Sequence, residues 1–599
     1  MTRLAVIAIF GIQLFAQGDC DMLGAYLQAW STDQTNGLVD HLSDNWIDVR
    51  DIAAHRNRCD APCTGPGIPM VPYDLASTEF ARFLSWVDQA VAGSPGYNFS
   101  ATDAMIAYQA TGVQAYVDLA IEMTDDFVSS EEALIGSAMR PTVAYDSYLY
   151  IGEIIGDLAT TYDWAFDQLT VTQRNRWSAY AEQAIWNVWN YDNAQWGGNP
   201  FPWSGWSINN PGNNYYYSFV EATMLWGLAS QNATWLDFLC TDKLPALATY
   251  FTQIPGGGSQ EGTGYGTSHA RLFRIYRIWR DATGQDLSNF STHTINSMEY
   301  WLHAVVPTLD YFAPLGDQAR VSTAPLYDYQ RNLVLRALDL NAGTLQAGHA
   351  AWWLNRISIF QMTSGFNFKH ELQAVTEPEM APTDLVYFSE GTGHLFARSD
   401  WTTQATWISV SAGPYRESHD HPDQGAFSIY KDSWQAVAQN IHTHSGIFQD
   451  VTGHNVLRFQ QGATVLSPGY DTYGTQTHSW DSGDLVVQAN LTPSFVNHPD
   501  ILSWNRVVRF NQTLVKVTDA TSVQNGVTVN WQLNTPAQPV IVGNEIHAGA
   551  LRIVPIVPAA PTIQILDWTT VDPSEHLSGY RIELGGSTQY EVDIHIDLP

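Results

Sequence analysis

Two segments of the chain concentrate residue types that can transfer protons. Residues 256–266 read Gly-Gly-Gly-Ser-Gln-Glu-Gly-Thr-Gly-Tyr-Gly and present a single phenol, Tyr265, in a glycine-rich turn. Residues 419–427 read His-Asp-His-Pro-Asp-Gln-Gly-Ala-Phe and carry His419 and His421. Tyrosine and histidine side chains both serve as general acids and bases. Their placement on separate elements predicts a cleft between two domains that supports proton-transfer chemistry.

Histidines and amides gather around the second segment. On an extended chain, residues two apart face the same side, so His419 and His421 should present their imidazoles together. The strands expected after them form a hairpin, which returns Gln439 and Asn440 beside His421. His454 follows, and the pattern predicts a divalent metal held by His421, His454 and one of the two amides. The alternative is a surface histidine cluster that only hydrogen-bonds the strand ends.

Further polar candidates lie in the helical part of the chain. Asn213 and Asn214 open a predicted helix, where an asparagine either caps the helix or binds a substrate carboxylate. Arg271 begins a row of arginines at three-residue steps, which is also typical of an ordinary solvated helix face. The polar loop 315–320 ends in Arg320, which suits an acidic sugar.

Length, composition and charge set broad limits on the class of protein. At 599 residues the chain is too long for one ordinary core, and a hydrophobic fraction of 45% excludes a disordered chain. Its 27 Lys and Arg residues against 60 Asp and Glu residues give a net charge of −33, which argues against nucleic-acid binding through a basic face. The 23 tryptophans mostly predict core packing, although tryptophan also stacks on sugar rings.

Hydrophobic periodicity divides the chain into a helical part and a strand part. Apolar residues recur at three- and four-residue steps up to about residue 375, and at two-residue steps from about residue 384. Many helices joined by long Gly/Pro/Asn-rich loops favour a helical toroid or solenoid. Helices followed by strands indicate two domains, 19–375 and 384–599, joined through a segment that Pro378 and Pro382 interrupt.

The first residues are typical of an export signal. Arg3 provides a positive flank, an apolar run follows at residues 4–15, and the small residues after it offer a cleavage site. Residues 1–18 are therefore expected to be a signal peptide, and the mature protein is expected to be secreted or periplasmic. The apolar run is too short for a membrane span. An exported chain permits disulfides among its four cysteines, Cys20, Cys59, Cys63 and Cys240.

Several of these motifs together resemble the heparinase II/III-like polysaccharide lyases, whose relatives include alginate lyases and, distantly, dermatan sulfate epimerase. The motifs are Asn213-Asn214 before a helix, the glycine-rich segment ending at Tyr265, the Gly316-Asp317 loop, His419-x-His421-x-Asp423, and His454-Asn455. The resemblance extends over residues 151–531. It implies an (α/α) toroid followed by an antiparallel β-sandwich, with the cleft between them, and export.

The resemblance also implies β-elimination at a uronic acid of an anionic polysaccharide. The C5 proton is hardly acidic while the neighbouring carboxylate is charged, so a polar group must neutralise that charge before a base removes the proton. By its motif, Asn214 matches the neutralising residue and Tyr265 the catalytic tyrosine, which can serve as acid, or as both acid and base when its phenolate is accessible. His419 matches a base or neutraliser. His421 and His454 match metal ligands in members that bind zinc or manganese.

The chain departs from the family pattern at two places. Many relatives have His where this chain has Tyr215, which shifts the role of base toward His419 and Tyr265. The third metal ligand is commonly Asp, whereas Gln439 or Asn440 stands in the corresponding stretch; a neutral amide binds a divalent ion more weakly, so a metal here is expected to be structural. No organic cofactor is expected. The expected substrate contacts are Asn213, Tyr215, Glu261, Arg271, Arg320 and Arg416.

Three other functions fit parts of the pattern. A uronyl C5-epimerase on the same scaffold would begin with the same removal of the C5 proton. A glycoside hydrolase on an (α/α) toroid would need paired carboxylates, for which Glu261 with Asp163 or Asp317 are the candidates. A non-catalytic carbohydrate-binding protein would suit the many tryptophans, but it would not require the tyrosine and histidine motifs.

Overall fold

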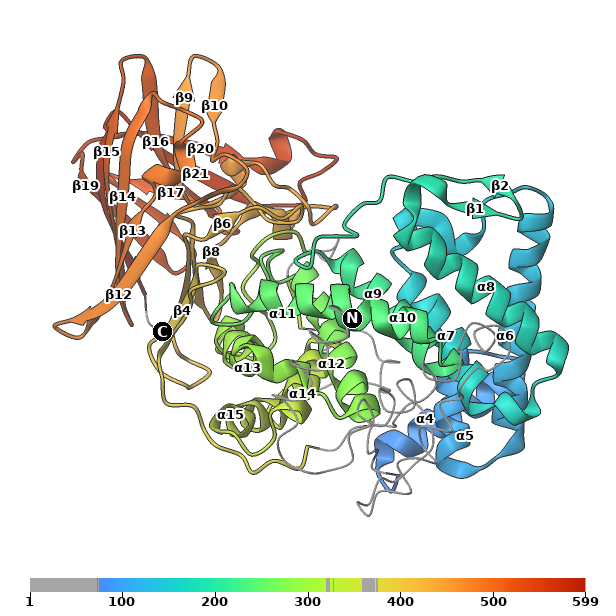
Figure 1. Cartoon of the computed structure of the whole chain (residues 1–599). Coiled ribbons are helices and arrows are strands. Elements are labelled where there is room, and N and C mark those ends of the chain that lie inside the picture. The colour runs from blue at the N-terminus through green and yellow to red at the C-terminus, as the bar shows by residue number, and fades with distance from the viewer. Residues whose placement is uncertain are drawn as a thin grey trace, which may run out of the picture. The chain divides into compact units, whose positions relative to one another are not determined.

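The chain folds into two compact units, each built from segments that are distant in the sequence (Figure 1). The computed structural model describes residues 73, 75–318, 324–326, 328–357, 372 and 375–597. Unit 1 comprises Met1–Thr249, Arg271–Phe290 and Phe366–Ala374, and unit 2 comprises Tyr250–Ala270, Ser291–Gly365 and Val375–Pro599. Helices from the N-terminal part of the chain therefore contribute to both units.

Unit 1 is helical. Its helices are α4 (Thr78–Val91), α5 (Ala101–Thr111), α6 (Gln114–Gly136), α7 (Ile151–Trp164), α8 (Val171–Trp189), α9 (Asn214–Ser230), α10 (Ala233–Phe238) and most of α11 (Leu244–Thr252) and α12 (His269–Thr283). A two-stranded ribbon joins β1 (Gln195–Trp196) to β2 (Asn199–Pro200). Helix α9 is apolar nearly all round, and it is buried from Tyr216 to Ser230. A helix with that composition must lie inside a helical assembly.

Close helix packing in unit 1 depends on glycines of α7. A Cβ on Gly152 would come within 2.8 Å of Glu221 Oε2 and 2.9 Å of Ser218 Oγ, both on α9, and one on Gly156 would lie 3.2 Å from Leu225 Cδ1. The backbone N–H of Gly152 donates to Ser218 Oγ at 2.9 Å. Because these positions lack side chains, α7 and α9 can approach closely and bury their shared face.

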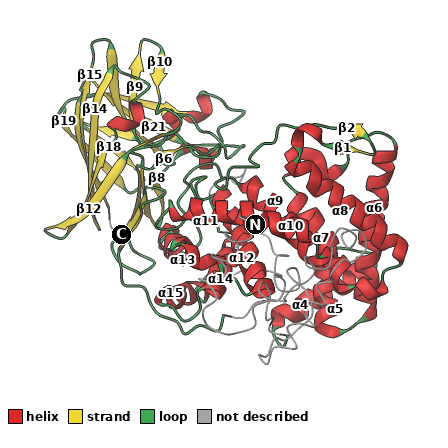
Figure 2. Ribbon diagram, in the orientation of Figure 1, coloured by secondary structure: helices red, strands yellow, loops and turns green. Residues whose placement is uncertain are grey.

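Unit 2 combines helices with all the large sheets. Its helices α13 (His293–Ala304), α14 (Asp328–Leu340) and α15 (Leu345–Leu354) pack on one another, and α13 also packs on β3 and β4. Figure 2 shows the helices in the N-terminal part of the chain and the long strands in the C-terminal part. The buried Arg398 guanidinium donates to the carbonyl oxygens of Leu302, His303 and Val305 at 2.9–3.3 Å. These bonds join the C-terminal end of α13 to strand β4.

Three large antiparallel sheets make up most of the described strand part of unit 2. The first, in the order β3-β4-β5-β7-β8, contains β3 (Val386–Ser389), β4 (His394–Arg398), β5 (Trp407–Ser411), β7 (Phe427–Lys431) and β8 (Ser433–Ala436). The second, in the order β10-β9-β16-β21-β20, contains β9 (Leu457–Gln461), β10 (Thr464–Leu466), β16 (Val527–Thr535), β20 (Thr562–Asp567) and β21 (Tyr580–Gly585).

The third sheet has eight strands in the order β12-β13-β14-β15-β22-β19-β18-β17. They are β12 (Thr475–Asp481), β13 (Asp484–Asn490), β14 (Ile501–Asn511), β15 (Leu514–Val523), β17 (Val540–Val542), β18 (Glu545–Ala548), β19 (Leu551–Val557) and β22 (Gln589–Ile596). A short ribbon pairs β6 (Pro414–Tyr415) with β11 (Thr472–Tyr473).

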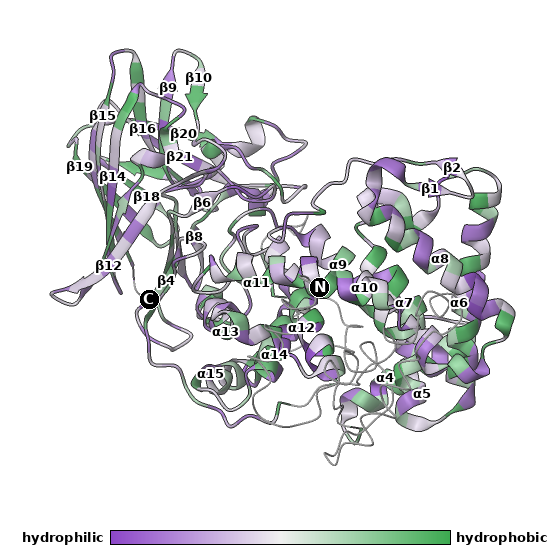
Figure 3. Cartoon of the chain, in the orientation of Figure 1, coloured by the Kyte–Doolittle hydropathy of each residue, from purple (hydrophilic) through white to green (hydrophobic). Residues whose placement is uncertain are grey.

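One hydrophobic core is shared by residues of all three sheets. In β14 and β22, buried residues alternate with more exposed ones, as expected for strands with one face on the core. Strands β4, β5 and β7 are instead buried at every residue. The edge strand β12 carries hydrophilic side chains, as Figure 3 shows, which suits its exposed position.

The predicted order of helices followed by antiparallel strands is confirmed. The predicted hairpin is also present: β7 pairs with β8, and Asp432 takes a left-handed φ of 60° between them. Among the described residues, no helix is both long enough and apolar enough to cross a membrane. Cys240 is a free thiol. The predicted signal peptide, the other three cysteines and Arg320 lie outside the described residues.

Candidate active site

The glycine-rich turn that carries Tyr265 packs directly against the Gly316-Asp317 loop. A Cβ on Gly264 would lie 2.1 Å from the carbonyl oxygen of Asp317, and one on Gly316 would lie 2.7 Å from the carbonyl oxygen of His419. Gly316 also has a φ of 68°, a conformation that favours glycine. The backbone N–H of Asp317 donates to the carbonyl oxygen of His419 at 2.8 Å. Three segments of unit 2 are thereby held together at backbone contact distance.

This packing places the two predicted proton-transfer residues face to face. Tyr265 begins the short helix η5 (Tyr265–Ser268), and His419 lies in the loop between β6 and β7. Their rings stack with centroids 3.5 Å apart and planes inclined by 8°. Tyr265 is half-buried, and the His419 side chain is 22% exposed. Both residues belong to unit 2, so the phenol and the imidazole form one local pair.

Asp317 holds both histidines of the His-x-His motif. Its Oδ2 lies 2.9 Å from His419 Nδ1, and its Oδ1 lies 2.8 Å from His421 Nε2. The side-chain amide of Gln449 donates to Oδ2 at 3.0 Å. Burial alone would raise the pKa of Asp317, but the hydrogen bonds from His419, His421 and Gln449, together with the electrostatic influence of His421, hold it below its ordinary value. The carboxylate is therefore stabilised in its ionised form.

The third histidine, His454, faces the far side of His421. His421 Nδ1 and His454 Nε2 are 3.0 Å apart, and both side chains are buried. Burial, reinforced by the neighbouring His421, lowers the pKa of His454 well below its ordinary range. Burial also raises the pKa of Asp423 to about 6, against the opposing influence of His421 and of the hydrogen bond from Ser411.

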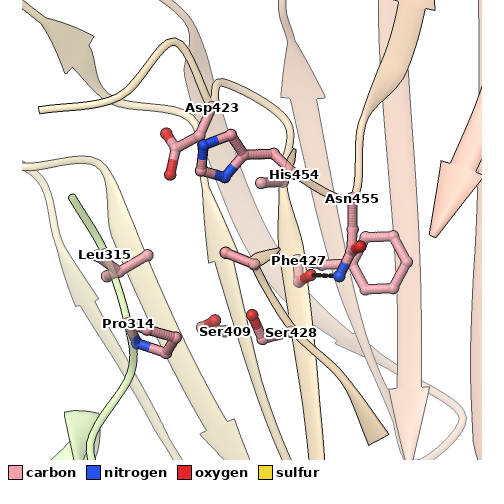
Figure 4. Close-up of a pocket in the computed structure, with 10 residues that line it drawn as sticks. Pro314, Leu315, Ser409, Asp423, Phe427, Ser428, His454 and Asn455 are labelled. Carbon is pink, nitrogen blue, oxygen red and sulfur yellow. Dashed lines mark hydrogen bonds between the residues drawn. The ribbon is translucent and has the colours of Figure 1, made fainter. Parts of the chain in front are cut away.

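A small cavity of ≈ 10 Å³ adjoins His454 and Asp423, which is room for about one water molecule (Figure 4). Its polar lining consists of Ser409, Asp423, Ser428, His454 and Asn455. Figure 4 shows the carboxylate of Asp423 beside the ring of His454. The side chain of Asn455 is fixed by donating to the carbonyl oxygen of Phe427 at 2.7 Å.

The two amides predicted as metal ligands have different surroundings. Gln439 donates to the carbonyl oxygen of Ser578 at 2.7 Å and lies near His576, so its amide is bonded to that segment. Asn440 donates to the carbonyl oxygen of Gly316 at 2.9 Å, and its buried Oδ1 has no hydrogen-bond partner. Within the residues that the structure describes, no three His, Cys, Asp or Glu side chains converge as a metal site. A metal would therefore rely on the two imidazoles and neutral oxygens.

The predicted carboxylate-binding residues at the start of α9 belong to unit 1. Asn213 caps the helix: its Oδ1 accepts from the backbone N–H of Tyr215 at 3.2 Å, and the side chain is buried. Asn214 is the first residue of α9 and is half-buried. The hydroxyl of Tyr215 donates to Asp146 Oδ1 at 2.9 Å. Of the two predictions for Asn213, the structure supports the helix cap.

Two predicted substrate contacts, Arg271 and Glu261, are paired or buried within the protein. Arg271 and Arg274 do not form a solvated face, because both guanidinium groups pair with the buried Glu221 at 2.8 and 2.7 Å. Arg271 also pairs with Glu153 at 2.6 Å, so its guanidinium group is bound to two carboxylates of the protein. Glu261 is completely buried, at 0% exposure, which argues against direct contact with a substrate. Arg416 remains accessible, and it lies 3.3 Å from Asp471.

The sequence does not predict the contacts of Asp317. The motifs include the Gly316-Asp317 pair, but they predict for Asp317 only a place in a hydrolase pair. The only local indication of these contacts is an aspartate next to a glycine in a loop between two predicted helices. Its contact with His419 and His421 depends on tertiary structure, because the residues are more than 100 positions apart.

Comparison with known proteins identifies a fold. No family model matches the chain, and no curated protein matches it. Among solved structures, the chain is similar to Heparinase III, with 14% identity, a TM-score of 0.57, and 91% of this chain and 88% of that chain covered. It is also similar to heparan sulfate lyase HepC from Pedobacter heparinus, with 13% identity, a TM-score of 0.56 and coverage of 92% and 88%.

A third similar structure is the Streptomyces coelicolor A3 chondroitin AC lyase in complex with chondroitin sulphate, with 12% identity, a TM-score of 0.52 and coverage of 88% and 80%. The likeness extends over most of each chain. At these identities it establishes the fold alone. It confirms the predicted architecture, an (α/α) toroid followed by an antiparallel β-sandwich.

Proposed function

We propose that this protein is a polysaccharide lyase that cleaves a uronic-acid-containing polysaccharide by β-elimination. The observation that carries the proposal is the stacked pair of Tyr265 and His419, with Asp317 bonded to the imidazole. An acid-base pair of this kind suits removal of a C5 proton and protonation of the departing O4. The fold shared with the heparinase and chondroitin lyase structures agrees with this chemistry.

In the proposed reaction, each side chain has one task. Asn214 neutralises the uronate carboxylate, which makes the C5 proton more acidic. His419 assists as base or as a second neutralising group, using the ring nitrogen that Asp317 does not bind. Tyr265 donates a proton to O4 of the departing sugar, and its phenolate can also serve as base. Arg416 and Tyr215 are proposed substrate contacts.

The structure favours elimination over hydrolysis. A glycosidase needs two carboxyl groups that reach the same glycosidic bond. Of the two candidates in unit 2, Glu261 is fully buried and Asp317 is occupied by two imidazoles and an amide. Neither of these two carboxylates is available to a sugar, which supports the phenol and the imidazole as the acid-base groups.

A divalent metal, zinc or manganese, is proposed as a structural component. The facing nitrogens of His421 and His454, 3.0 Å apart, fit two ligand positions, and the unpartnered Oδ1 of Asn440 is a candidate neutral oxygen. Asp317, on the other nitrogen of His421, would orient that ligand. When bound, the ion would cross-link the loops that carry these residues. Elemental analysis with and without chelator tests this proposal; an unchanged melting temperature and no bound metal would contradict it.

Export is proposed from the N-terminal sequence. If residues 1–18 are a signal peptide, N-terminal sequencing of the protein recovered outside the cytoplasm should begin near Asp19. A mature protein that still begins at Met1 would contradict this proposal.

The decisive experiment is a panel of uronate polymers: alginate, glucuronan, ulvan and glycosaminoglycans. Elimination creates a double bond conjugated to the carboxylate, so ultraviolet absorbance should rise with at least one polymer. New reducing ends without absorbance would indicate hydrolysis. Altered C5 configuration at constant chain length would indicate an epimerase. Either outcome would replace the lyase proposal.

A further inference from the structure

We propose that Asp317 is a positioning residue that sets the tautomers of both His419 and His421. Each of its two carboxylate oxygens lies within hydrogen-bond distance of a different imidazole, 2.9 Å from His419 Nδ1 and 2.8 Å from His421 Nε2. The consequence for catalysis rests on the proposed lyase function. The assignment of the tautomers rests on geometry alone.

An ionised carboxylate can only accept hydrogen bonds. Both ring nitrogens that face Asp317 must therefore carry a proton. A neutral imidazole has one N–H and one lone pair, so the opposite nitrogen of each ring is left unprotonated. For His419 that nitrogen is Nε2, and for His421 it is Nδ1.

The two histidines thus receive different tasks from the same aspartate. His419 Nε2 keeps a lone pair that can accept a proton, and the partly exposed ring is stacked on Tyr265. His421 Nδ1 turns its lone pair toward His454 Nε2, 3.0 Å away. His454 then donates its Nε2–H to His421, or both nitrogens share a bound ion. One carboxylate in this way serves both the proposed acid-base pair and the histidine pair behind it.

The loop that carries Asp317 is fixed closely enough for such a role. Its backbone N–H is bonded to His419, and its carbonyl oxygen lies where a Cβ on Gly264 would collide. Gln449 donates to the same carboxylate and also to the carbonyl oxygen of Ser418. At 2% exposure, Asp317 is shielded from water that would otherwise compete for these hydrogen bonds.

The test measures tautomers directly. Nitrogen-15 NMR of histidine-labelled full-length protein, above the ordinary histidine pKa of about 6.5, distinguishes protonated from unprotonated ring nitrogens. Difference spectra of His419→Gln and His421→Gln assign the two rings. The wild type should show His419 protonated on Nδ1 and His421 on Nε2. The opposite tautomer at either ring would overturn the proposal.

Asp317→Asn supplies the second arm. An asparagine offers one accepting oxygen and one donating amino group, so at least one imidazole must reverse its tautomer. In that variant kcat should fall by up to about 10⁴-fold, with a smaller change in KM, which is the scale known when such an aspartate becomes asparagine. Unchanged tautomers, or an unchanged kcat, would overturn the proposal. If Asp317→Asn does not fold, the wild-type spectrum still decides.

Glu131→Gln is the matched control. Glu131 is equally buried in unit 1, where its Oε2 accepts from the hydroxyl of Tyr180 at 2.8 Å. Its loss should lower the melting temperature without changing the His419 or His421 tautomers or kcat. Should the wild type cleave no uronate polymer, the lyase proposal fails, while the spectra still test the role of Asp317.

Discussion

Both units contain a buried carboxylate that lies between two nitrogen-bearing side chains and can be compared directly. In unit 1, Glu221 on α9 pairs with Arg271 and Arg274 on α12. In unit 2, Asp317 is bonded to His419 and His421. Both carboxylates are nearly inaccessible, at 1% and 2% exposure. The two clusters have the same plan and differ in the chemistry of the donors.

That difference separates a structural cluster from a reactive one. Guanidinium groups stay charged and have no lone pair to offer, so the Glu221 cluster can only join two helices. Each imidazole bonded to Asp317 retains a second nitrogen that can accept a proton or a metal. The comparison predicts that changes around Asp317 affect catalysis, whereas changes around Glu221 affect stability.

The largest effect is expected for Tyr265→Phe. The proposed reaction needs the phenol oxygen, so kcat on a cleaved uronate polymer should fall by about 10²- to 10⁴-fold. The ring remains, so stacking on His419 and the melting temperature should be retained. Initial rates of absorbance increase measure the loss. Tyr180→Phe is the control, because it removes a tyrosine hydroxyl that is bonded to Glu131 at 2.8 Å in unit 1. Activity that survives in Tyr265→Phe would remove the tyrosine from the mechanism.

Glu221→Ala should break the other cluster. Removing the carboxylate leaves the partly buried Arg271 and Arg274 without their shared partner, and leaving such charged donors unsatisfied costs about 1–3 kcal/mol. Chemical denaturation should show this loss, while kcat per folded molecule stays near that of the wild type. Asp281→Asn provides a milder comparison, since its pairs with Arg277 and Arg280 are partly exposed and should contribute less than about 1 kcal/mol. A Glu221→Ala protein of wild-type stability would contradict the structural role.

Acid should weaken unit 2 through His293, which supports the glycine-rich turn. Its Nε2 lies 2.8 Å from the carbonyl oxygen of Gly258, and burial lowers its pKa to about 4. Between pH 6.5 and 4 the unfolded chain binds a proton that the folded one does not, so stability falls as the pH is lowered through this range. The contribution reaches about 3 kcal/mol at most. His293→Gln should flatten the fall in melting temperature, and an equally steep profile would exclude His293 as its source.

Much of the fold was predictable because periodicity is a local property. Alternating residues such as those of β14 and β22 identify strands that pack one face on a core. The division into two units could not be predicted from local sequence. Helix α13 packs with the sheets, and Arg398 bonds to carbonyl oxygens at the end of that helix that are distant in the sequence. The comparison structures confirm the predicted architecture.

The candidate site residues could be predicted where they belong to a short sequence motif with a fixed spacing. The prediction that Tyr265 and His419 converge is confirmed by their stacked rings. Buried partners were missed, because nothing local distinguishes Asp317 from a loop carboxylate or Arg271 from a solvated helix residue. The pairing of Arg271 with Glu221 joins residues 50 positions apart, and only folding brings them together.

The discontinuous layout of unit 2 has a consequence for biosynthesis. The Tyr265 turn leaves the ribosome long before the strands that follow Val375, although all of them belong to one compact unit. Domains fold as units during translation, from the N-terminus onward. The glycine-rich turn must therefore wait, without its final backbone partners, until the segments bearing His419 and His454 have been made. A nascent chain interrupted before those segments contains the phenol but lacks the imidazole that stacks on it.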